Sequence, residues 1–231
     1  MADSPTPTTR RSCLSQLLIL ILMTVILALG AAMIRITQPQ PLKDIDGYLP
    51  ELKPAPVKNI RALLKDAVER EYPVTLTEAT INQWLARTLV ARQGGLLSRQ
   101  VSFDRVCVRL EDGYAEVIMA RQFFGRPMTV SMFLTLKRVQ GPKGGVTEVN
   151  FHGGPYHKRL PLLLRGGRFG KLVVPQGFLL FVLPAYQQLA ELFHPETHLG
   201  FEEMAVIKIE KHRLTLDPRK PKSSEGTPPP I

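Results

Sequence analysis

The most constraining feature of this chain is an uncharged, apolar segment near its start, from Leu17 to Ile34. A helix rises ~1.5 Å per residue, so this segment reaches ~27 Å, close to the ~30 Å hydrocarbon core of a bilayer. It is longer than the ~7–15 apolar residues of a secretory signal peptide. We therefore expect a transmembrane signal anchor over residues 14–36. A cleaved signal peptide is the alternative, because the small residues around Gly30 fit a cleavage site.

The charges around this segment predict its orientation. Arg10 and Arg11 precede it, and Arg35 follows it. Under the positive-inside rule, the short N-terminus (residues 1–13) is expected in the cytoplasm and the rest of the chain outside. The sequence thus predicts a single-pass protein of the cell membrane with an extracytoplasmic domain, in a bacterial envelope.

The remainder of the chain divides by composition. Residues 37–56 are rich in proline, which forbids regular helix, and are interpreted as a spacer that lifts the domain off the membrane. Residues 57–217 have a length typical of one domain. Residues 218–231 are rich in proline and serine and are expected to be disordered.

Periodicity predicts an α+β domain. Apolar residues at helical spacing predict amphipathic helices over 57–71 and from Thr77 to the Gly94-Gly95 pair. Alternation from Val106 onward predicts an antiparallel meander of at least four strands. Residues 153–175 are interpreted as an irregular loop, and residues 204–217 as a final hairpin turning near His212.

A long apolar helix is expected over residues 176–193, kinked at Pro184. Its first half is apolar on all sides, so it must be fully buried or meet a second apolar surface. We therefore expect the antiparallel sheet to curve and pack on this helix.

The candidate binding residues form two sets. An apolar ligand is expected between the sheet and the long helix, where methionine provides an adaptable lining. These residues are Met128, Met132, Leu134, Phe178, Phe181 and Val182. A mixed basic and leucine-rich segment is expected to contact anionic lipid or an anionic envelope polymer, in keeping with the formal net charge of +10. Its basic residues are Lys158, Arg159, Arg165, Arg168 and Lys171. The basic residues are not interleaved with aromatic ones, so no nucleic-acid partner is expected.

No enzyme signature is present. The chain lacks GxSxG, P-loop, GxGxxG and HExxH motifs. His194 and His198 have a ligand-like spacing, but Pro195 lies between them. Cys13 and Cys107 lie on opposite sides of the anchor and cannot pair, and no histidine is spaced to activate Cys107 as a nucleophile. We therefore expect no catalytic residues, no metal site and no cofactor.

Several short motifs resemble those of a known family. Leu76-Thr77-Glu78 begins a helix, Phe169 to Pro175 (FGKLVVP) leads into the apolar helix, and Ile207 to Glu210 (IKIE) forms a late strand. With the anchor, this order resembles YpmS-like envelope proteins. That resemblance implies a single-pass protein with an α+β extracytoplasmic domain and a suspected lipid-binding role, with no catalytic residues to transfer. The long basic loop before Phe169 departs from the family pattern.

The sequence thus predicts an anchored envelope protein that is not an enzyme and that binds an apolar or amphiphilic, lipid-like ligand. A structural protein that docks onto other envelope proteins is the alternative from a different class. A hydrolase is a distant third, because carboxylates are few and none are paired by the sequence. An enclosed apolar pocket would favour a ligand, whereas a solid core with an exposed apolar patch would favour a partner.

Overall fold

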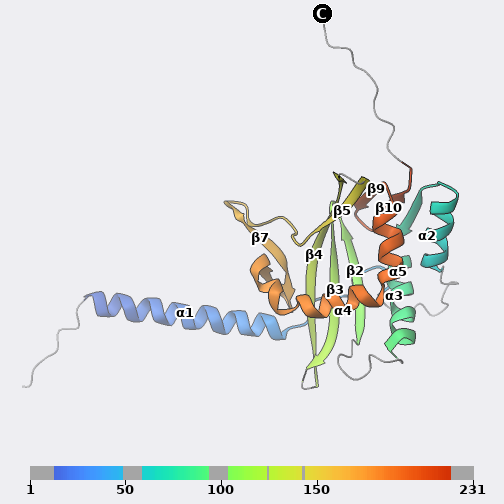
Figure 1. Cartoon of the computed structure of the whole chain (residues 1–231). Coiled ribbons are helices and arrows are strands. Elements are labelled where there is room, and N and C mark those ends of the chain that lie inside the picture. Colours follow the sequence, from blue (N-terminus) through green and yellow to red (C-terminus); the bar gives the residue numbers. More distant parts are fainter. Residues whose placement is uncertain (1–12, 49–58, 94–103, 124, 142–143, 220–231) are drawn as a thin grey trace, which may run out of the picture.

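An N-terminal helix and two antiparallel sheets dominate the computed structural model, which describes residues 13–48, 59–93, 104–123, 125–141 and 144–219 (Figure 1). Helix α1 (Cys13–Thr37) has no buried residue and is long and apolar enough to cross a membrane. The α+β class, the antiparallel pairing and the N-terminal apolar helix are confirmed. The predicted cytoplasmic residues 1–12, and residues 220–231 of the predicted disordered tail, lie outside the described residues.

The larger sheet has seven strands in the described part of the chain, with the order β2-β3-β4-β7-β6, while β5 pairs with β4 and β8 with β7. Its long strand β4 pairs with β3 along its first half and with β5 along its second. The strands are β2 (Arg105–Glu111), β3 (Tyr114–Phe123), β4 (Arg126–Gly141), β5 (Gly144–Asn150), β6 (Pro155–His157), β7 (Leu160–Phe169) and β8 (Leu172–Pro175). The predicted meander is confirmed over β2 to β5.

The smaller sheet has the order β1-β10-β9. Its strands are β1 (Val74–Thr77), β9 (Val206–Glu210) and β10 (Arg213–Asp217). The predicted final hairpin is confirmed. Strand β1, which the sequence pattern did not predict, pairs with β10 and leads directly into a helix.

The predicted amphipathic helices are α2 (Ile60–Glu69) and α3 (Glu78–Gln93). Thr77 caps α3, since its hydroxyl accepts the Thr80 N–H at 3.2 Å. The helical segments between β8 and β9 are η2 (Gln176–Phe181), α4 (Leu183–Leu192), α5 (His194–Thr197) and the π turn η3 (His198–Glu202).

Two predictions between residues 153 and 193 are wrong. The expected irregular loop contains strands β6, β7 and β8. Paired glycines suggested a loop, but Gly167 lies within strand β7, where a Cβ atom would collide with the Ser131 carbonyl of β4. It therefore marks a close approach of two backbones. The expected continuous helix is broken into η2 and α4, because Pro184 in the first turn of α4 has no N–H to extend a preceding helix.

Helices cover one face of the larger sheet. Tyr186 and Leu189 of α4 belong to one buried cluster with Met119 and Met132 of the sheet. The hydroxyl of Tyr186 lies 2.9 Å from the Val117 carbonyl, and burial raises the pKa of this phenol well above its usual value. Helix α3 contributes Leu85 and Leu89 to the same cluster.

The segment that follows α1 covers the opposite face of the sheet. Leu42 and Ile45 are buried against Cys107 of β2 and Ile118 of β3. The Pro-rich stretch that was interpreted as a spacer is thus packed on the domain over its described part, up to Tyr48. Residues 49–58 lie outside the described part.

A buried polar network holds this segment in place. Glu116 is 1 % exposed and accepts a hydrogen bond from Arg109 at 2.7 Å and another from the Ser131 hydroxyl. Arg109 also donates to Asp44 and to the Pro41 carbonyl, both in the segment after α1. Burial lowers the pKa of the Arg109 guanidinium, but Glu116 and Asp44 together outweigh burial and raise that pKa.

We expect Glu116→Gln to lower the free energy of unfolding by about 3 kcal/mol, because it leaves the buried Arg109 charge with only the exposed Asp44 carboxylate. Urea unfolding of the full chain in detergent, followed by fluorescence of the single Trp84, measures this. Glu148→Gln on the exposed surface of β5 is the control and is expected to stay within about 0.5 kcal/mol of wild type. Equal effects of the two substitutions would contradict the role of the buried pair.

Candidate functional site: an apolar surface beside helix α1

The turn between β7 and β8 lies directly against the end of α1. The backbone N–H of Lys171 donates to the Arg35 carbonyl at 3.0 Å. Gly170 has a φ of +55°, and a Cβ atom there would collide with the carbonyls of Arg35, Ile36 and Gln38. Helix α1 and the domain are therefore in direct backbone contact.

The part of the domain beside this junction carries exposed apolar side chains. They come from β7 and η2, which contact each other where Gly166 packs on Gln176 and Leu179. We call this set the apolar surface: Leu160, Leu162, Leu163, Phe178, Leu180 and Phe181. Leu162 is 98 % exposed and Phe181 is 80 % exposed, so these side chains have no place in the domain's own core. The β6–β7 hairpin and η2 lie on the α1 side of the domain (Figure 1).

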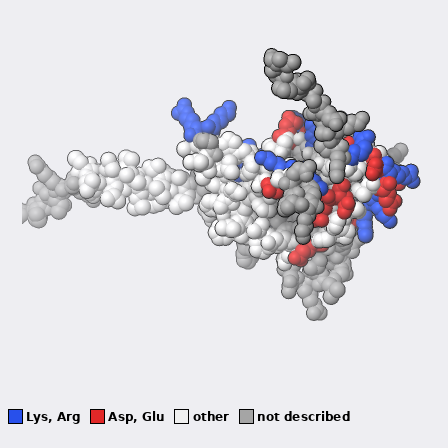
Figure 2. Space-filling view, turned by 45° about the horizontal axis from the view of Figure 1, so that its top comes forward, with Lys and Arg blue, Asp and Glu red and all other residues white. Residues whose placement is uncertain are grey.

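Charge is distributed unevenly along the molecule (Figure 2). Lys158 and Arg159 form the turn at the tip of the β6–β7 hairpin, and both are exposed. Figure 2 shows basic side chains at the end of the projection beside α1, mostly uncharged surface beneath them, and both signs of charge gathered at the opposite end of the domain. The exposed Lys171 adds a further positive charge at the junction with α1.

The structure separates the five predicted basic contacts into two groups. Lys158, Arg159 and Lys171 are exposed. Arg165 and Arg168 instead turn into the domain, where each guanidinium lies 5.7 Å from the centre of the Phe133 ring. Arg168 also pairs with the buried Glu116 at 3.5 Å. Since these two side chains hold β7 on the sheet, they are not part of the exposed basic group.

The six predicted apolar contacts are likewise in two environments. Met132 is buried in the core between sheet and helices, and Leu134 and Val182 pack against that core. Met128 is partly buried on β4. Phe178 and Phe181 are exposed and belong to the apolar surface. Leu160, Leu162 and Leu163 of β7 are exposed as well, and they belong to the mixed basic and leucine-rich segment that the sequence predicts to contact lipid.

The structure also shows the surroundings of the residues that were considered as catalytic or metal-binding groups. Cys107 is buried on β2, and burial raises the pKa of its thiol to about 11. His194 begins α5 and His198 begins η3, and their ring centroids are 6.2 Å apart. His198 faces the exposed Glu202 and Glu203. Tyr186 has a raised pKa, and Arg109 and Glu116 form a buried ion pair, but all three side chains contribute to the packing of the sheet.

No protein-family model, curated protein or solved structure matches this chain. The resemblance to YpmS-like envelope proteins therefore stays a prediction from short sequence motifs.

We expect Gly170→Ala to destabilise the protein by about 1–3 kcal/mol, because the new Cβ atom meets three carbonyls and the backbone there is left-handed. Gly177→Ala in η2 is the matched control, since its Cβ atom would meet nothing within 4 Å. Thermal unfolding of both variants in detergent, followed by circular dichroism, gives the comparison. A Gly170 variant as stable as the Gly177 variant would contradict the tight junction.

We expect Cys107 to resist alkylation in the folded protein. With a pKa of about 11, roughly one thiol in a thousand is ionised at pH 8, and only the thiolate reacts. Mass spectrometry after iodoacetamide treatment, with and without urea, measures the modification. Full modification of Cys107 without urea would show that the thiol is accessible and ionised.

Proposed function

We propose that this protein is a single-pass, non-enzymatic membrane protein whose extracytoplasmic domain binds lipid at the surface of the bilayer that holds α1. The observation that carries the proposal is the position of the apolar surface: it lies beside the end of a helix suited to cross a membrane. A surface fixed at that position is adjacent to lipid headgroups whenever α1 is inserted.

The composition of this surface supports lipid rather than water as its surroundings. Fully burying a leucine or phenylalanine side chain is worth about 1.5–3 kcal/mol, so exposing six of them together on a soluble domain is unfavourable. Insertion among headgroups and the upper acyl chains removes them from water. Lys158 and Arg159 at the hairpin tip and Lys171 at the junction then match anionic headgroups, each basic side chain near the surface contributing about 1 kcal/mol.

The proposed lipid contact differs from the enclosed ligand site expected between sheet and helix. Met132 lies in a packed cluster with Leu179, Tyr186 and Leu189, and the exposed Phe178 and Phe181 face outward. We therefore place the lipid-like ligand on the outside of the domain, at the apolar surface. A docking protein of the envelope, the alternative from sequence, would need to occupy the same surface.

A photo-crosslinking amino acid at Phe181 tests the proposal. The full chain carrying benzoyl-phenylalanine at this position is reconstituted in nanodiscs with anionic and zwitterionic phospholipid, irradiated and analysed by mass spectrometry. We expect lipid adducts at Phe181. The control position is Val146 on β5, which is 57 % exposed and belongs to the strand that contacts η3, away from α1. We expect at least about tenfold fewer lipid adducts there, since a headgroup layer extends only ~5–10 Å beyond the acyl boundary.

Charge is tested in the same system. The double variant Lys158→Gln with Arg159→Gln is expected to reduce the share of anionic lipid among the Phe181 adducts toward its share in the nanodisc. Equal adduct yields at Phe181 and Val146 would reject lipid contact at the apolar surface. Protein adducts from whole membranes, in place of lipid adducts, would favour the docking alternative.

A further inference from the structure

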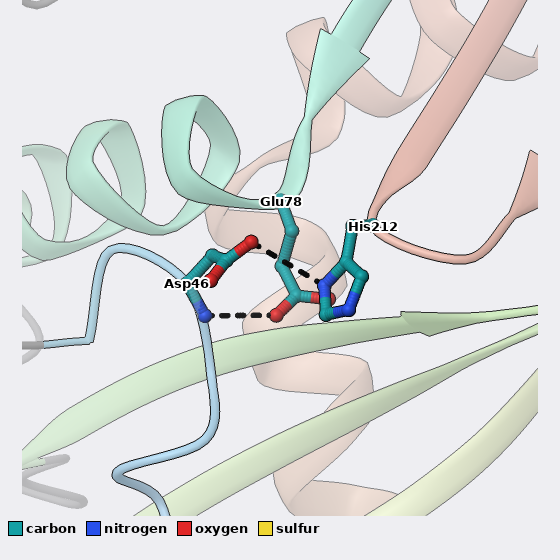
Figure 3. A group of neighbouring side chains, drawn as sticks. All are labelled: Asp46, Glu78 and His212. Atoms are coloured by element: carbon teal, nitrogen blue, oxygen red, sulfur yellow. Dashed lines mark hydrogen bonds and ion pairs between the residues drawn. The ribbon is translucent and has the colours of Figure 1, made fainter.

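Three potential metal ligands meet away from the apolar surface, where three separate segments of the domain come together (Figure 3). Asp46 belongs to the segment after α1, Glu78 is the first residue of α3, and His212 lies in the turn between β9 and β10. The Nδ1 atom of His212 is 3.4 Å from Oδ2 of Asp46 and 3.4 Å from Oε2 of Glu78. Side chains remote in the sequence thus converge on one point.

The Glu78 carboxylate is held rigidly. Its side chain is fully buried, its Oε1 accepts the Asp46 N–H at 2.9 Å, and its Oε2 accepts the Leu110 N–H at 2.7 Å. Each carboxylate oxygen has a second lone pair, so these bonds leave Oε2 able to bind a cation. Hydrogen bonds of this kind orient the carboxylate ligands of metal sites.

The backbone also fixes the position of His212. Its N–H donates to the Leu110 carbonyl at 3.1 Å, and its own carbonyl accepts the Glu78 N–H at 3.0 Å. The Nδ1 atom is buried and has no hydrogen-bond partner among the described residues, although it faces two carboxylates. A buried, unsatisfied nitrogen needs a partner, and an ion is one of the partners that satisfy such a group.

We propose that Asp46, Glu78 and His212 bind one divalent transition-metal ion, for which Zn²⁺ is the probe. Bonds of ~2.0–2.2 Å in a tetrahedral arrangement place ligand atoms about 3.3–3.6 Å apart. The two separations from His212 Nδ1 are 3.4 Å, and all three ligand atoms lie within 4.8 Å of one another. One imidazole nitrogen with two carboxylate oxygens suits Zn²⁺ better than Mg²⁺ or Ca²⁺, which take oxygen ligands. Two carboxylates balance the charge of the ion. The side chains of Asp46 and His212 are partly exposed, so a water molecule can supply the fourth ligand.

Such an ion joins the segment after α1, the start of α3 and the β9–β10 turn through metal–ligand bonds. The site is independent of the proposed lipid contact, since none of its three ligands belongs to the apolar surface. The alternative is that His212 simply lies beside the two carboxylates as a polar contact without an ion, and the experiment separates these two arrangements.

The experiment uses the full chain in detergent, treated with a chelator and transferred to buffer free of metal and phosphate. Calorimetric titration with ZnCl₂ is expected to give one ion per chain, and added Zn²⁺ is expected to raise the melting temperature. Asp46→Asn and His212→Asn are each expected to weaken Zn²⁺ binding by at least about tenfold, since even the partners behind metal ligands contribute about 10–100-fold. His198→Asn is the control, because His198 also lies beside two carboxylates, at 3.6 and 3.8 Å, on the surface.

The two test substitutions are chosen to preserve the fold. Asparagine tolerates the φ of +59° found at His212, and Asp46 holds Glu78 through its backbone N–H rather than its side chain. Circular dichroism in the absence of metal should match wild type for both variants. Co²⁺ gives a second readout, an absorption band in the visible range that His212→Asn should abolish. Absence of binding to wild type, or unchanged binding by His212→Asn, would overturn the proposal.

Discussion

The buried ion pair between Arg109 and Glu116 is the interaction on which the arrangement of this protein depends. A buried pair adds little net stability over apolar packing, because desolvation offsets the attraction. Its effect here is positional. Arg109 reaches Pro41 and Asp44, while Gln40 donates to Ser131, whose hydroxyl donates to Glu116. The segment after α1 thus supplies hydrogen-bond partners to Arg109, Thr129 and Ser131 on the buried face of the sheet.

Fixing that segment has two results. It gives the larger sheet a cover on both faces, with helices on one side and an extended segment on the other. It also brings Asp46 to Glu78 and His212. At its other end the segment begins at α1, whose last carbonyls contact the β7–β8 turn. The proposed lipid contact and the proposed metal site therefore lie at different points along the chain that leads from α1 into the domain.

Local signals were sufficient for much of the fold. The apolar run of α1, the helical spacing in α2 and α3, and the alternation of Met132 and Leu134 in β4 all act over a few residues. Alternation could not reveal that Thr129 and Ser131, on the other face of β4, are also buried, since their cover comes from a segment about 90 residues away. The glycines of β7 suggested a loop, because the sequence does not indicate that strand β4 approaches β7 closely enough to require glycine there.

The candidate sites also divide into features that short sequence patterns indicate and features that depend on contacts between distant segments. Phe178 and Phe181 lie in a segment apolar on all sides, which is expected to be fully buried or to meet a second apolar surface. The sequence placed them between sheet and helix, whereas both are exposed on the outside of the domain. The sequence could not show that Arg159 is exposed while Arg165 turns into the domain. Both lie in one basic stretch, and only their positions at the tip and the base of the β6–β7 hairpin distinguish them. Asp46, Glu78 and His212 give no spacing motif, because Asp46 and Glu78 are 32 positions apart and a distant hairpin supplies His212.

The tight junction at Gly170 has a mechanical consequence. The uncharged part of α1, residues 13–34, is about 33 Å long, slightly more than the roughly 30 Å of a typical hydrocarbon core. If α1 crosses a bilayer, tilting of the helix is one way in which such an excess is accommodated. Because the end of α1 contacts the β7–β8 turn without an intervening flexible linker, a tilt of the helix is transmitted to the domain. Bilayer thickness would then set the angle at which this domain meets the membrane surface.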